Sequence, residues 1–514
     1  MLSPDNNQSP QSRSPDPFLR PEQLPPPAQA RSKPPSTRIC LGTRRFGRLC
    51  VALVVTCLAC LGAFYAALSP HVLPGNLRMP HAITQISPDD FTDNSKVVRS
   101  RNATSRFRDN LLSSSDHKYI TAWPSSGWTN DVISAINLIY IAGLVGRTPV
   151  VPPFTPSHVG SFSEVGPIQF GAIFDVPRLA NGLRMHVVEW HELKHSVLDA
   201  TDPTGGGVAS EVEKIGCWSP WSQNPFTRGQ PRHSEVPTLY NLDISYTPVP
   251  ETFTLSKGFK KDQYYMSLWS LASLSYPETR GKVLSTQSAY TIPLASGTGE
   301  KVAPDDKMLC FDLLYFIGLT DEEEWWRDYA PYWRTVGVHL HWAPKLLELA
   351  QGYLRRHFDL KDGETIPPFI SVHVRRADFA GWCPPDTSPE SCFATRESYA
   401  KRVHEIQASL RARPNPIDAR AVLVTSDERD SAWWQKIAEL GPEWRWIDHA
   451  AEKTVEKYGK WYPVILDAVF QSMGAGFVGT DRSTMTLLSQ RRVEDWNGGL
   501  SAAVRWGTPS ADDH

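Results

Sequence analysis

The stretch FISVHVRRAD, residues 369–378, decides the fold of this 514-residue chain. Its apolar and polar residues alternate, so an extended strand sends its branched aliphatic side chains to one face and His373 and Arg375 to the other. We expect Arg375 to be the last strand residue, at the edge where open α/β sheets bind ligands. There a guanidinium can hold a phosphate through two parallel hydrogen bonds. The alternative is that Arg375 and Arg376 merely pair with Asp378 or with a nearby glutamate.

Strands and helices alternate from this strand to the C-terminus. Apolar runs of strand length at 421–427, 444–448 and 476–480 are separated by segments of helical periodicity. Such alternation is typical of a parallel sheet covered by helices. We therefore expect residues 361–514 to form a Rossmann-like domain.

A second strand-helix-strand pattern lies nearer the N-terminus. Residues 119–123 are strand-like, 131–146 are apolar at helical spacing and end on a glycine, and 147–154 are strand-like again. This βαβ unit requires a parallel sheet. We expect residues 118–360 to form a first Rossmann-like domain, with its glycine-containing loop at the carboxyl edge of the sheet.

The part of the chain between these patterns, from about 155 to 330, has no clear periodicity. We expect GCWSPWSQNPF (216–226) and the region TQSAYTIPLASGTGEK (286–301) to be loops or insertions, and the two tryptophans of the former to serve local packing. A long helix is expected at 342–358, and the linker at 359–368 is the expected domain boundary.

The N-terminal region differs in kind from the rest. Residues 1–48 begin with a proline-rich stretch that cannot bury enough apolar surface to fold, so we expect a disordered tail. Residues 49–68 carry no charge and are long enough to span a bilayer. Eight Lys or Arg residues precede this span, which places the tail in the cytosol and the bulk of the protein in a lumen. Residues 69–117 are expected to be a stem.

Cysteine usage agrees with a lumenal location. Cys383 and Cys392 flank a short Pro/Ser-rich loop and are the expected disulfide, while the pairing of Cys217 and Cys310 is left open. The spacing of Cys and His gives no support for a zinc site. Asn102 begins an N-glycosylation sequon in the expected stem.

Overall charge excludes some partners. The net charge of −2 gives no sign of a nucleic-acid-binding surface. The chain also lacks a DxD triplet, the pattern with which metal-dependent transferases hold a cation on a diphosphate, so no metal or other cofactor is expected.

Two further polar positions follow the apolar runs of the C-terminal region. Ser483 or Thr484 can cap a helix whose first N–H groups form an anion site, although capping alone is the simpler interpretation. Asp467 interrupts the apolar helix YPVILDAVF and needs a partner. The donors of a guanine edge would serve, and so would an arginine of the chain itself.

The sequence resembles a known family at several motifs in the same order. PSSGWTNDVISAINLIYIAGLVGRTPVVPP, FGAIFDVPRL, VHVRRADF, VTSDE, and Asp467 followed sixteen residues later by STM are similar to segments of the GDP-fucose protein O-fucosyltransferases. The resemblance extends from about residue 118 to 492. Similar HxRR elements occur in α1,6-fucosyltransferases that modify N-glycan cores.

The resemblance implies roles for individual residues and a GT-B fold, in which two Rossmann-like domains face each other across a cleft. Arg375 would contact the β-phosphate, His373 would lie against the nucleotide, and Asp467 would bind guanine. Ser483 and Thr484 would hold phosphate. The other residues expected to bind GDP-fucose are Asn130, near the fucose and the acceptor, with Gly127 and Asp378.

This sequence departs from the family pattern in two places. Met485 stands where the family has Phe after Ser-Thr, and Ser125, Ser126 and Gly127 stand where the branch acting on thrombospondin-type repeats has a Glu. The general base is therefore absent from its expected place. Asp131, a water molecule or a phosphate oxygen could take the proton.

Together these features predict an inverting fucosyltransferase that moves L-fucose from GDP-β-L-fucose to a Ser or Thr hydroxyl of a lumenal protein. The alternatives are a glycan-directed, α1,6-type fucosyltransferase and a membrane-tethered sugar-nucleotide or glycan-binding protein without turnover. A single-pass type II membrane protein of the Golgi or endoplasmic reticulum is expected.

Overall fold

The fold is that of a computed structural model. It describes residues 88–100, 102–114, 116–199, 209–224, 227, 229–255, 265–286, 290–292, 301–320, 324–361, 363–508 and 510–513. All of these residues belong to one compact unit. The expected tail at 1–48 and the expected membrane span at 49–68 lie outside the described residues.

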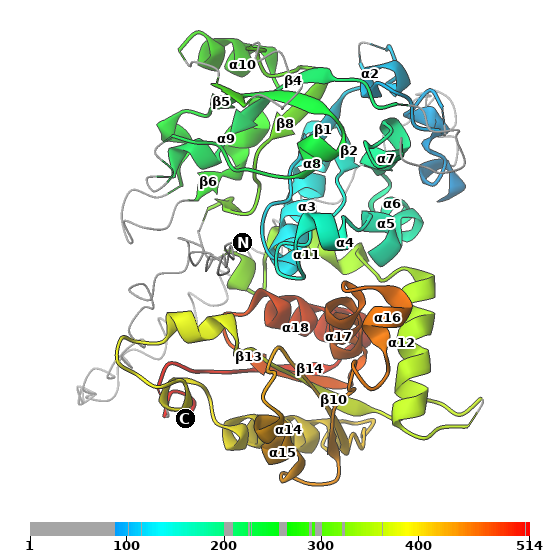
Figure 1. Cartoon of the computed structure of the whole chain (residues 1–514), viewed down its shortest axis with the longest axis vertical. Coiled ribbons are helices and arrows are strands. Elements are labelled where there is room, and N and C mark those ends of the chain that lie inside the picture. The colour runs from blue at the N-terminus through cyan, green and yellow to red at the C-terminus, as the bar shows by residue number, and fades with distance from the viewer. Residues whose placement is uncertain are drawn as a thin grey trace, which may run out of the picture. The chain divides into compact units, whose positions relative to one another are not determined.

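Among the described residues of the N-terminal half, seven strands form one sheet (Figure 1). Their order is β3-β2-β1-β8-β4-β5-β7, and neighbours are parallel except for β5 and β7. The carboxyl ends of β1, β8 and β4 therefore meet at one edge. The strands are β1 (Tyr119–Ala122), β2 (Thr148–Val151), β3 (Val188–Glu189), β4 (Glu213–Ser219), β5 (Leu242–Pro248), β7 (Tyr290–Ile292) and β8 (Met308–Phe311).

The described C-terminal half contains a five-stranded sheet in the order β12-β11-β10-β13-β14, with all neighbours parallel. Its strands are β10 (Phe369–Val374), β11 (Ala421–Ser426), β12 (Trp444–Arg445), β13 (Gly476–Thr480) and β14 (Leu500–Val504). The predicted alternation of strands and helices is confirmed here. A small parallel pair, β6 (Met266–Ser267) with β9 (Ile317–Gly318), accompanies the N-terminal half.

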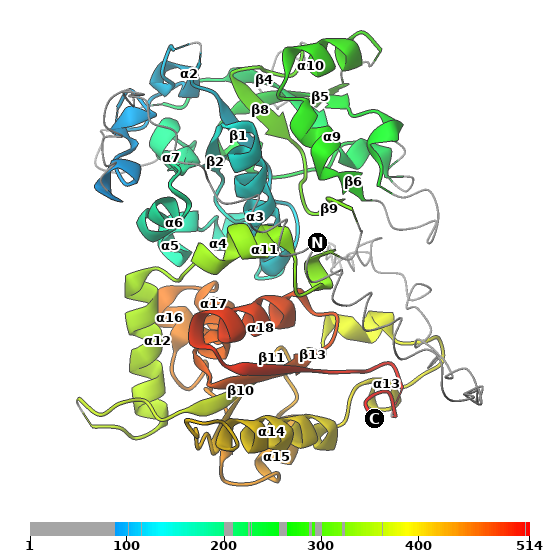
Figure 2. The ribbon, with the colours of Figure 1, turned by 180° about the vertical axis from the view of Figure 1, so that it is seen from behind.

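Helices cover the sheets. Figures 1 and 2 show α14 and α15 on one side of the five-stranded sheet and α17 and α18 on the other. The longer helices are α3 (Trp128–Val145), α6 (Val176–Leu183), α10 (Pro277–Leu284), α12 (Pro344–His357), α14 (Arg396–Arg411), α15 (Ser431–Ala438), α17 (Tyr462–Met473) and α18 (Thr484–Asn497). Short α-helices are α2 (Phe107–Asn110), α4 (Phe162–Val165), α5 (Phe170–Ile173), α7 (Trp190–Leu193), α8 (Val236–Leu239), α9 (Leu268–Ser273), α11 (Pro331–Thr335), α13 (Pro389–Cys392) and α16 (Thr454–Tyr458). The 3-10 turns are η2 (Pro88–Phe91), η3 (Asn94–Lys96), η5 (Trp221–Gln223), η7 (Glu251–Phe253), η8 (Glu324–Trp326), η9 (Gly337–His339) and η10 (Asp378–Trp382).

Helix α3 is the apolar helix of the predicted βαβ unit. It begins after Gly127 and ends at Gly146, whose φ of 64° lies in the left-handed region that favours glycine. Among the described residues it is the one helix with the length and hydropathy of a membrane span, but 67% of that window is buried inside the protein. We therefore interpret α3 as a core helix.

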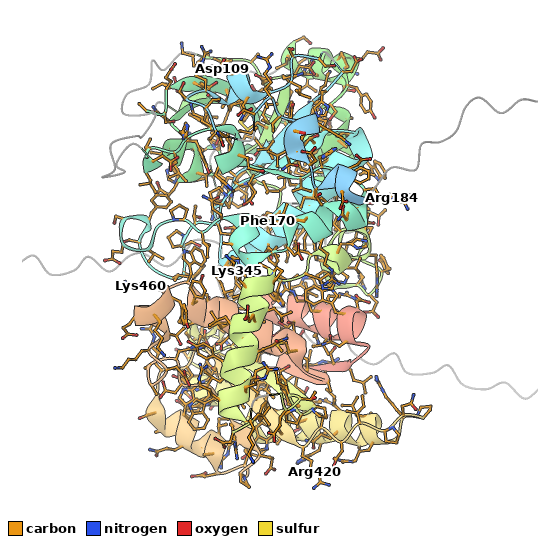
Figure 3. All side chains as sticks on the ribbon, turned by 90° about the vertical axis from the view of Figure 1, so that its right-hand side faces the viewer. Asp109, Phe170, Arg184, Lys345, Arg420 and Lys460 are labelled. Carbon is orange, nitrogen blue, oxygen red and sulfur yellow. A yellow bond between two sulfur atoms is a disulfide. The ribbon has the colours of Figure 1, made fainter. Side chains whose placement is uncertain are left out.

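The chain passes from one half to the other through the segment before α12. Trp342 stacks on Phe174 of the N-terminal half, with ring centroids 5.4 Å apart. Within α12 itself, the Tyr353 hydroxyl lies 2.9 Å from Thr454 Oγ1 of α16, so this helix contacts the C-terminal half, although we placed it in the first domain. Figure 3 shows Lys345 at the end of α12 that is nearer the N-terminal half.

The middle of the chain corrects the prediction of loops. The segment expected as a loop at 216–226 begins inside β4, where Trp218 is fully buried. Residues 290–292, in the other expected insertion, form β7. Cys217 of β4 and Cys310 of β8 form a disulfide with a Cα–Cα distance of 4.5 Å, which supplies the pairing that the sequence left open. Strand partners more than ninety residues apart are invisible to local periodicity.

Residues 88–112, which we expected in the stem, are folded onto the N-terminal half. Phe107 and Leu111 are 0% and 3% exposed, and the Phe107 N–H donates to Glu213 Oε2. The segment is mostly polar, so its few buried apolar residues were not recognised from the sequence. Asn102, the expected glycosylation site, is exposed.

Candidate active site

The strand β10 positions the first predicted site residues. It ends at Val374, so Arg375 is the first residue beyond the strand. Our prediction that Arg375 is the last residue of the strand is therefore wrong by one position. The predicted alternation is confirmed: Ile370 and Val372 join the apolar cluster beneath α14, whereas His373 faces α18. Arg375 still stands at the carboxyl edge of the sheet.

The Arg375 guanidinium lies between two carboxylates. Its Nη2 donates to Asp378 Oδ2 at 2.8 Å, and its Nη1 is 2.9 Å from Asp427 Oδ2. Its main-chain N–H donates to Thr480 Oγ1 at the end of β13, 2.8 Å away. The side chain is 28% exposed, and these carboxylates use only part of its N–H donors. A phosphate arriving here would share or exchange these partners.

The neighbouring Arg376 turns to different partners. Its Nε donates to Glu428 Oε2 at 2.7 Å, and its guanidinium lies 4.6 Å from the centre of the Phe393 ring. Its main-chain N–H donates to Asp427 Oδ1. Arg376 therefore braces the loop, and its pairing with a glutamate is the one that the alternative interpretation of the sequence expected.

His373 is buried against the first turn of α18. Its Nδ1 is 3.0 Å from Thr486 Oγ1. Burial and the nearby Arg375 charge lower the pKa of His373 to about 3, so the ring is neutral near pH 7. Gly479 allows this close approach, because a Cβ there would lie 2.6 Å from the Thr486 side chain.

The N-termini of α18 and α3 meet at a pair of threonines. Ser483 is the N-cap of α18, and its side chain accepts the N–H of Thr486. Thr484 Oγ1 donates to Asn130 Oδ1 at 2.8 Å and lies 2.7 Å from Thr129 Oγ1. Unpaired N–H groups and the helix dipoles make such termini favourable for an anion. The contact joins predicted residues of the two halves.

The loop before α3 is held by a buried carboxylate. Asp131 is 1% exposed, and its Oδ1 accepts the N–H groups of Ser125 and Ser126, each at 3.1 Å. Burial raises the pKa of Asp131 to about 8, although these N–H groups and Arg232 act in the opposite direction. Asp131 is therefore largely protonated near pH 7. Gly127, which ends the loop, is the N-cap of α3.

Asp467, on α17, pairs with a side chain of the protein itself. Its Oδ1 is 3.0 Å from His449 Nε2, and His449 Nδ1 is 3.1 Å from Thr454 Oγ1. Burial alone would lower the pKa of His449, but the charge and hydrogen bond of Asp467, with nearby acidic groups, raise it. The partner is a histidine where the sequence had suggested an arginine or a guanine edge.

Comparison with protein families now gives the family. The model of the GDP-fucose protein O-fucosyltransferases matches residues 119–494. The chain belongs to this family of glycosyltransferases.

Solved structures give more distant likenesses. The apo crystal structure of POFUT1 is 17% identical, covers 77% of this chain and 100% of its own, and has a TM-score of 0.43. Fucosyltransferase NodZ from Bradyrhizobium is 12% identical, covers 73% of this chain and 93% of its own, and has a TM-score of 0.34. Curated protein sequences give no match.

In this O-fucosyltransferase-family chain, the predicted residues fall into two groups. Arg375 and His373 connect through Thr480 and Thr486 to the first turn of α18, and Thr484 there connects to Asn130. Asp378 belongs to the same group through Arg375. Asp467 forms a separate pair with His449. Asp467 lies on α17, and α17 packs against α18.

Sequence reasoning missed four polar residues. Asp427 follows β11 at the carboxyl edge, so the rule that singled out Arg375 could have found it. His449 had no local signal. Arg232 contacts the loop before α3, and Asp312 contacts Arg232; both come together only through long-range folding of the N-terminal sheet.

Two further features concern ligands. Within the described ranges, no three His, Cys, Asp or Glu side chains gather as metal ligands. A cavity of about 430 Å³ lies beside α18 and β14 and is lined by residues that include Trp326, Arg482, Thr486 and Arg491. Neither Arg375 nor Asp467 lines it, so we do not equate it with the candidate site.

Proposed function

We propose that this protein is an inverting fucosyltransferase that transfers L-fucose from GDP-β-L-fucose to a Ser or Thr hydroxyl of a protein. Family membership supports the donor and the reaction class. In this reaction the acceptor oxygen attacks the anomeric carbon from the face opposite GDP. The bond to the diphosphate breaks, and GDP leaves with the charge that develops on its β-phosphate.

One observation carries the proposal. Arg375 is bonded to Thr480 at the end of β13, and the next turn brings Ser483 and Thr484 to the N-terminus of α18. The guanidinium follows one strand and the helix N-terminus follows the neighbouring strand, so the two can together stabilise a leaving diphosphate. His373, neutral and buried behind them, supports the first turn of α18 without adding charge.

Guanine would bind beside α17. Asp467 can accept hydrogen bonds from the N–H edge of a guanine base, and His449 orients its carboxylate. The Asp467–His449 pair is part-buried, so water competes less for a hydrogen bond between Asp467 and a bound base than it would at the surface. Met485 stands in the first turn of α18, where the family Phe would stack.

The fucose and the acceptor would lie on the side of the N-terminal half. Gly127 and Asn130 are at the start of α3, and Asn130 already contacts Thr484. Asp131 is 1% exposed, and its Oδ1 is taken up by the N–H groups of Ser125 and Ser126, which argues against it as the general base. We propose that a water molecule or a phosphate oxygen of GDP takes the acceptor proton.

The larger layout belongs to the same proposal. We propose a GT-B arrangement of a 118–360 acceptor-side domain and a 361–514 donor domain, behind a type II membrane anchor at 49–68. The basic residues before Leu49 support a cytosolic N-terminus and a Golgi or endoplasmic-reticulum lumen for the enzyme. In sealed microsomes, added protease should remove only the N-terminal tail; digestion of the remainder would refute this topology.

The direct test is GDP release by the full-length protein. Purified chain is incubated with GDP-fucose alone, with Ser/Thr-containing protein acceptors, and with N-glycan acceptors. Faster release with a protein acceptor and fucose found on its hydroxyls would support the proposal, and fucose found only on the glycan would favour the α1,6-type alternative. Tight binding of GDP-fucose without any turnover would indicate a binding protein. Activity should persist in EDTA, since the proposed transfer uses no metal.

A further inference from the structure

The loop at 124–127 leads directly into the N-terminal part of the candidate site, and its polar groups are tied down. Asp131 accepts the N–H groups of Ser125 and Ser126. Ser234 Oγ donates to the carbonyl of Pro124 at 2.5 Å. A loop whose main chain is bonded on both sides has little freedom to change the direction of the helix start that follows it.

Arg232 provides the contacts that close this arrangement. Its Nε donates to Ser125 Oγ at 3.0 Å and its Nη2 to the Ser125 carbonyl at 2.7 Å. The guanidinium also lies 5.3 Å from the centre of the Trp221 ring. The planar fork therefore holds the side chain and the main chain of one residue at once, which the single ammonium of lysine cannot reproduce.

Arg232 is fixed in turn by the buried Asp312. The Arg232 N–H donates to Asp312 Oδ2 at 3.0 Å, and the same carboxyl group accepts from Ser219 Oγ and from the Trp221 N–H. Asp312 follows β8, Ser219 ends β4, and the loop at 124–127 follows β1. The network thus connects the carboxyl ends of three neighbouring strands to the start of α3.

We propose that Arg232 is a positioning residue for the fucosyl group of the donor. It acts through Ser125 on the loop, and the loop sets the place of Asn130, which meets Thr484 across the two halves. This inference rests on the proposed function. It adds that the N-terminal half fixes the sugar through its own loop, which reaches the GDP-binding first turn of α18 through the contact of Asn130 with Thr484.

A split between two ligands follows from this arrangement. GDP would be held by Arg375, Asp467 and the first turn of α18, whereas the Arg232 side chain bonds Ser125 of the loop. The fucosyl group would depend on the loop that Arg232 fixes. Loss of Arg232 should therefore affect GDP-fucose and leave GDP alone, whereas a merely structural role would affect both ligands or only the melting temperature.

The test uses the full-length wild type and its Arg232→Gln, Arg232→Lys and Arg232→Ala variants. Titration calorimetry measures the Kd for GDP and for GDP-fucose, and GDP release measures turnover. For Arg232→Gln we expect the GDP Kd to be unchanged and GDP-fucose turnover to fall about 10- to 100-fold, the range for losing hydrogen bonds from a charged donor. Arg232→Lys should recover little. Added guanidinium ion at non-denaturing concentration should partly restore Arg232→Ala.

The matched control is Arg280→Gln. Arg280 pairs with Asp306, which precedes β8 and so lies at the opposite end of the strand from Asp312. This variant also loses the polar contacts of an arginine side chain in the N-terminal half, here with Asp306, but it should keep both Kd values and the turnover of the wild type.

Two results would overturn the inference. One is an Arg232→Gln variant with wild-type turnover and GDP-fucose affinity. The other is an equal loss of GDP and GDP-fucose affinity, which would indicate a general structural role. A wild-type protein that binds no GDP-fucose would be a different failure, because the proposed function itself would fall and this inference with it.

Discussion

The two parallel sheets carry opposite kinds of polar chemistry at their carboxyl edges. The five-stranded sheet presents Arg375 and Arg376, partly exposed and paired with acidic side chains. The seven-stranded sheet presents Asp131 and Asp312, which are 1% and 0% exposed and accept mainly from main-chain N–H groups. One edge therefore offers charges that can exchange partners, and the other offers a fixed frame built on buried carboxyl groups.

This difference suits the two tasks of a transfer reaction. A leaving diphosphate gains charge and needs a cation that can follow it, as a part-exposed guanidinium can. The sugar and the acceptor need fixed geometry, since misplacement by a fraction of an ångström lowers the rate. The comparison also implies that substitutions at the two edges should fail in different ways, and the following experiments use that contrast.

The largest expected difference concerns the two disulfides. Cys217–Cys310 joins neighbouring strands inside the N-terminal sheet and closes a separation of 93 residues, whereas Cys383–Cys392 closes one of 9 in the loop after Arg375. Chain-entropy arguments give about 4 to 5 kcal/mol for the first and about 2 to 3 kcal/mol for the second. Paired Cys→Ala variants, measured by chemical unfolding, should rank in this order. The reverse order would contradict the larger contribution that chain entropy assigns to the disulfide of the N-terminal sheet.

The next largest effect is expected when the Arg375 guanidinium is removed. Arg375→Ala should lower GDP-fucose turnover by about 10²- to 10³-fold, because one charge-stabilising donor is lost from the leaving group. Arg375→Lys keeps the charge without the fork and should recover little. GDP affinity should fall much less than turnover.

The control for this cation is its neighbour. Arg376→Ala breaks the contacts with Glu428 and Phe393, so it should act mainly on the melting temperature. If both variants keep near-full turnover at unchanged stability, the phosphate-binding role of Arg375 fails. If only Arg376→Ala is inactive, the roles of the two arginines are exchanged.

A smaller effect is expected at Asp467, the residue that we propose binds the guanine base. Asp467→Asn keeps the size of the side chain but replaces one carboxylate acceptor with a donor, so the GDP Kd should rise about 10- to 100-fold. The discrimination against ADP should fall with it. His449→Gln, which leaves the carboxylate in place, should weaken GDP binding less. Equal GDP affinity in wild type and Asp467→Asn would remove guanine recognition from this site.

The sequence predicted the C-terminal edge far better than the N-terminal one, and the reason is physical. Around β10 the strands are short apolar or alternating runs between helical segments, so periodicity located them and the carboxyl-edge rule drew attention to His373, Arg375 and Ser483. The helix cap at Ser483 was likewise a local signal. The one-residue error in the end of β10 arose because alternation continues into the first loop residue.

The N-terminal frame depends on contacts that no local pattern records. β4 contains Gly, Cys, Trp and Ser where a strand normally shows alternating or branched residues, and we therefore expected a loop. Its partner β8 lies 93 residues away at the disulfide. Arg232 and Asp312 became recognisable only when these strands were brought together. Asp131 was named as a possible base, but its burial, which sets its protonation, could not be read from sequence.

The last contrast is in the pH dependence of stability, and the two edges should differ in sign. Burial raises the pKa of Asp131 to about 8 and that of Asp312 to about 7, so the folded protein holds protons that the unfolded chain has lost. Their contribution is complete in acid and is lost as pH rises toward 8. For Glu428, burial alone would raise the pKa, but nearby N–H groups and Arg376 lower it; its contribution is present at neutral pH and lost in acid.

Matched amides separate these contributions. The free energy of unfolding of wild type minus that of Asp131→Asn should fall by about 1.4 kcal/mol per pH unit between pH 5 and 7, because one proton is held by the folded state alone. The corresponding difference for Glu428→Gln should be flat over this range and should shrink only in more acidic solution. Urea unfolding of the three proteins at several pH values measures both differences. A flat difference for Asp131→Asn would mean that its carboxyl group is ionised in the folded protein, and the contrast in charge between Asp131 and Glu428 would then not exist.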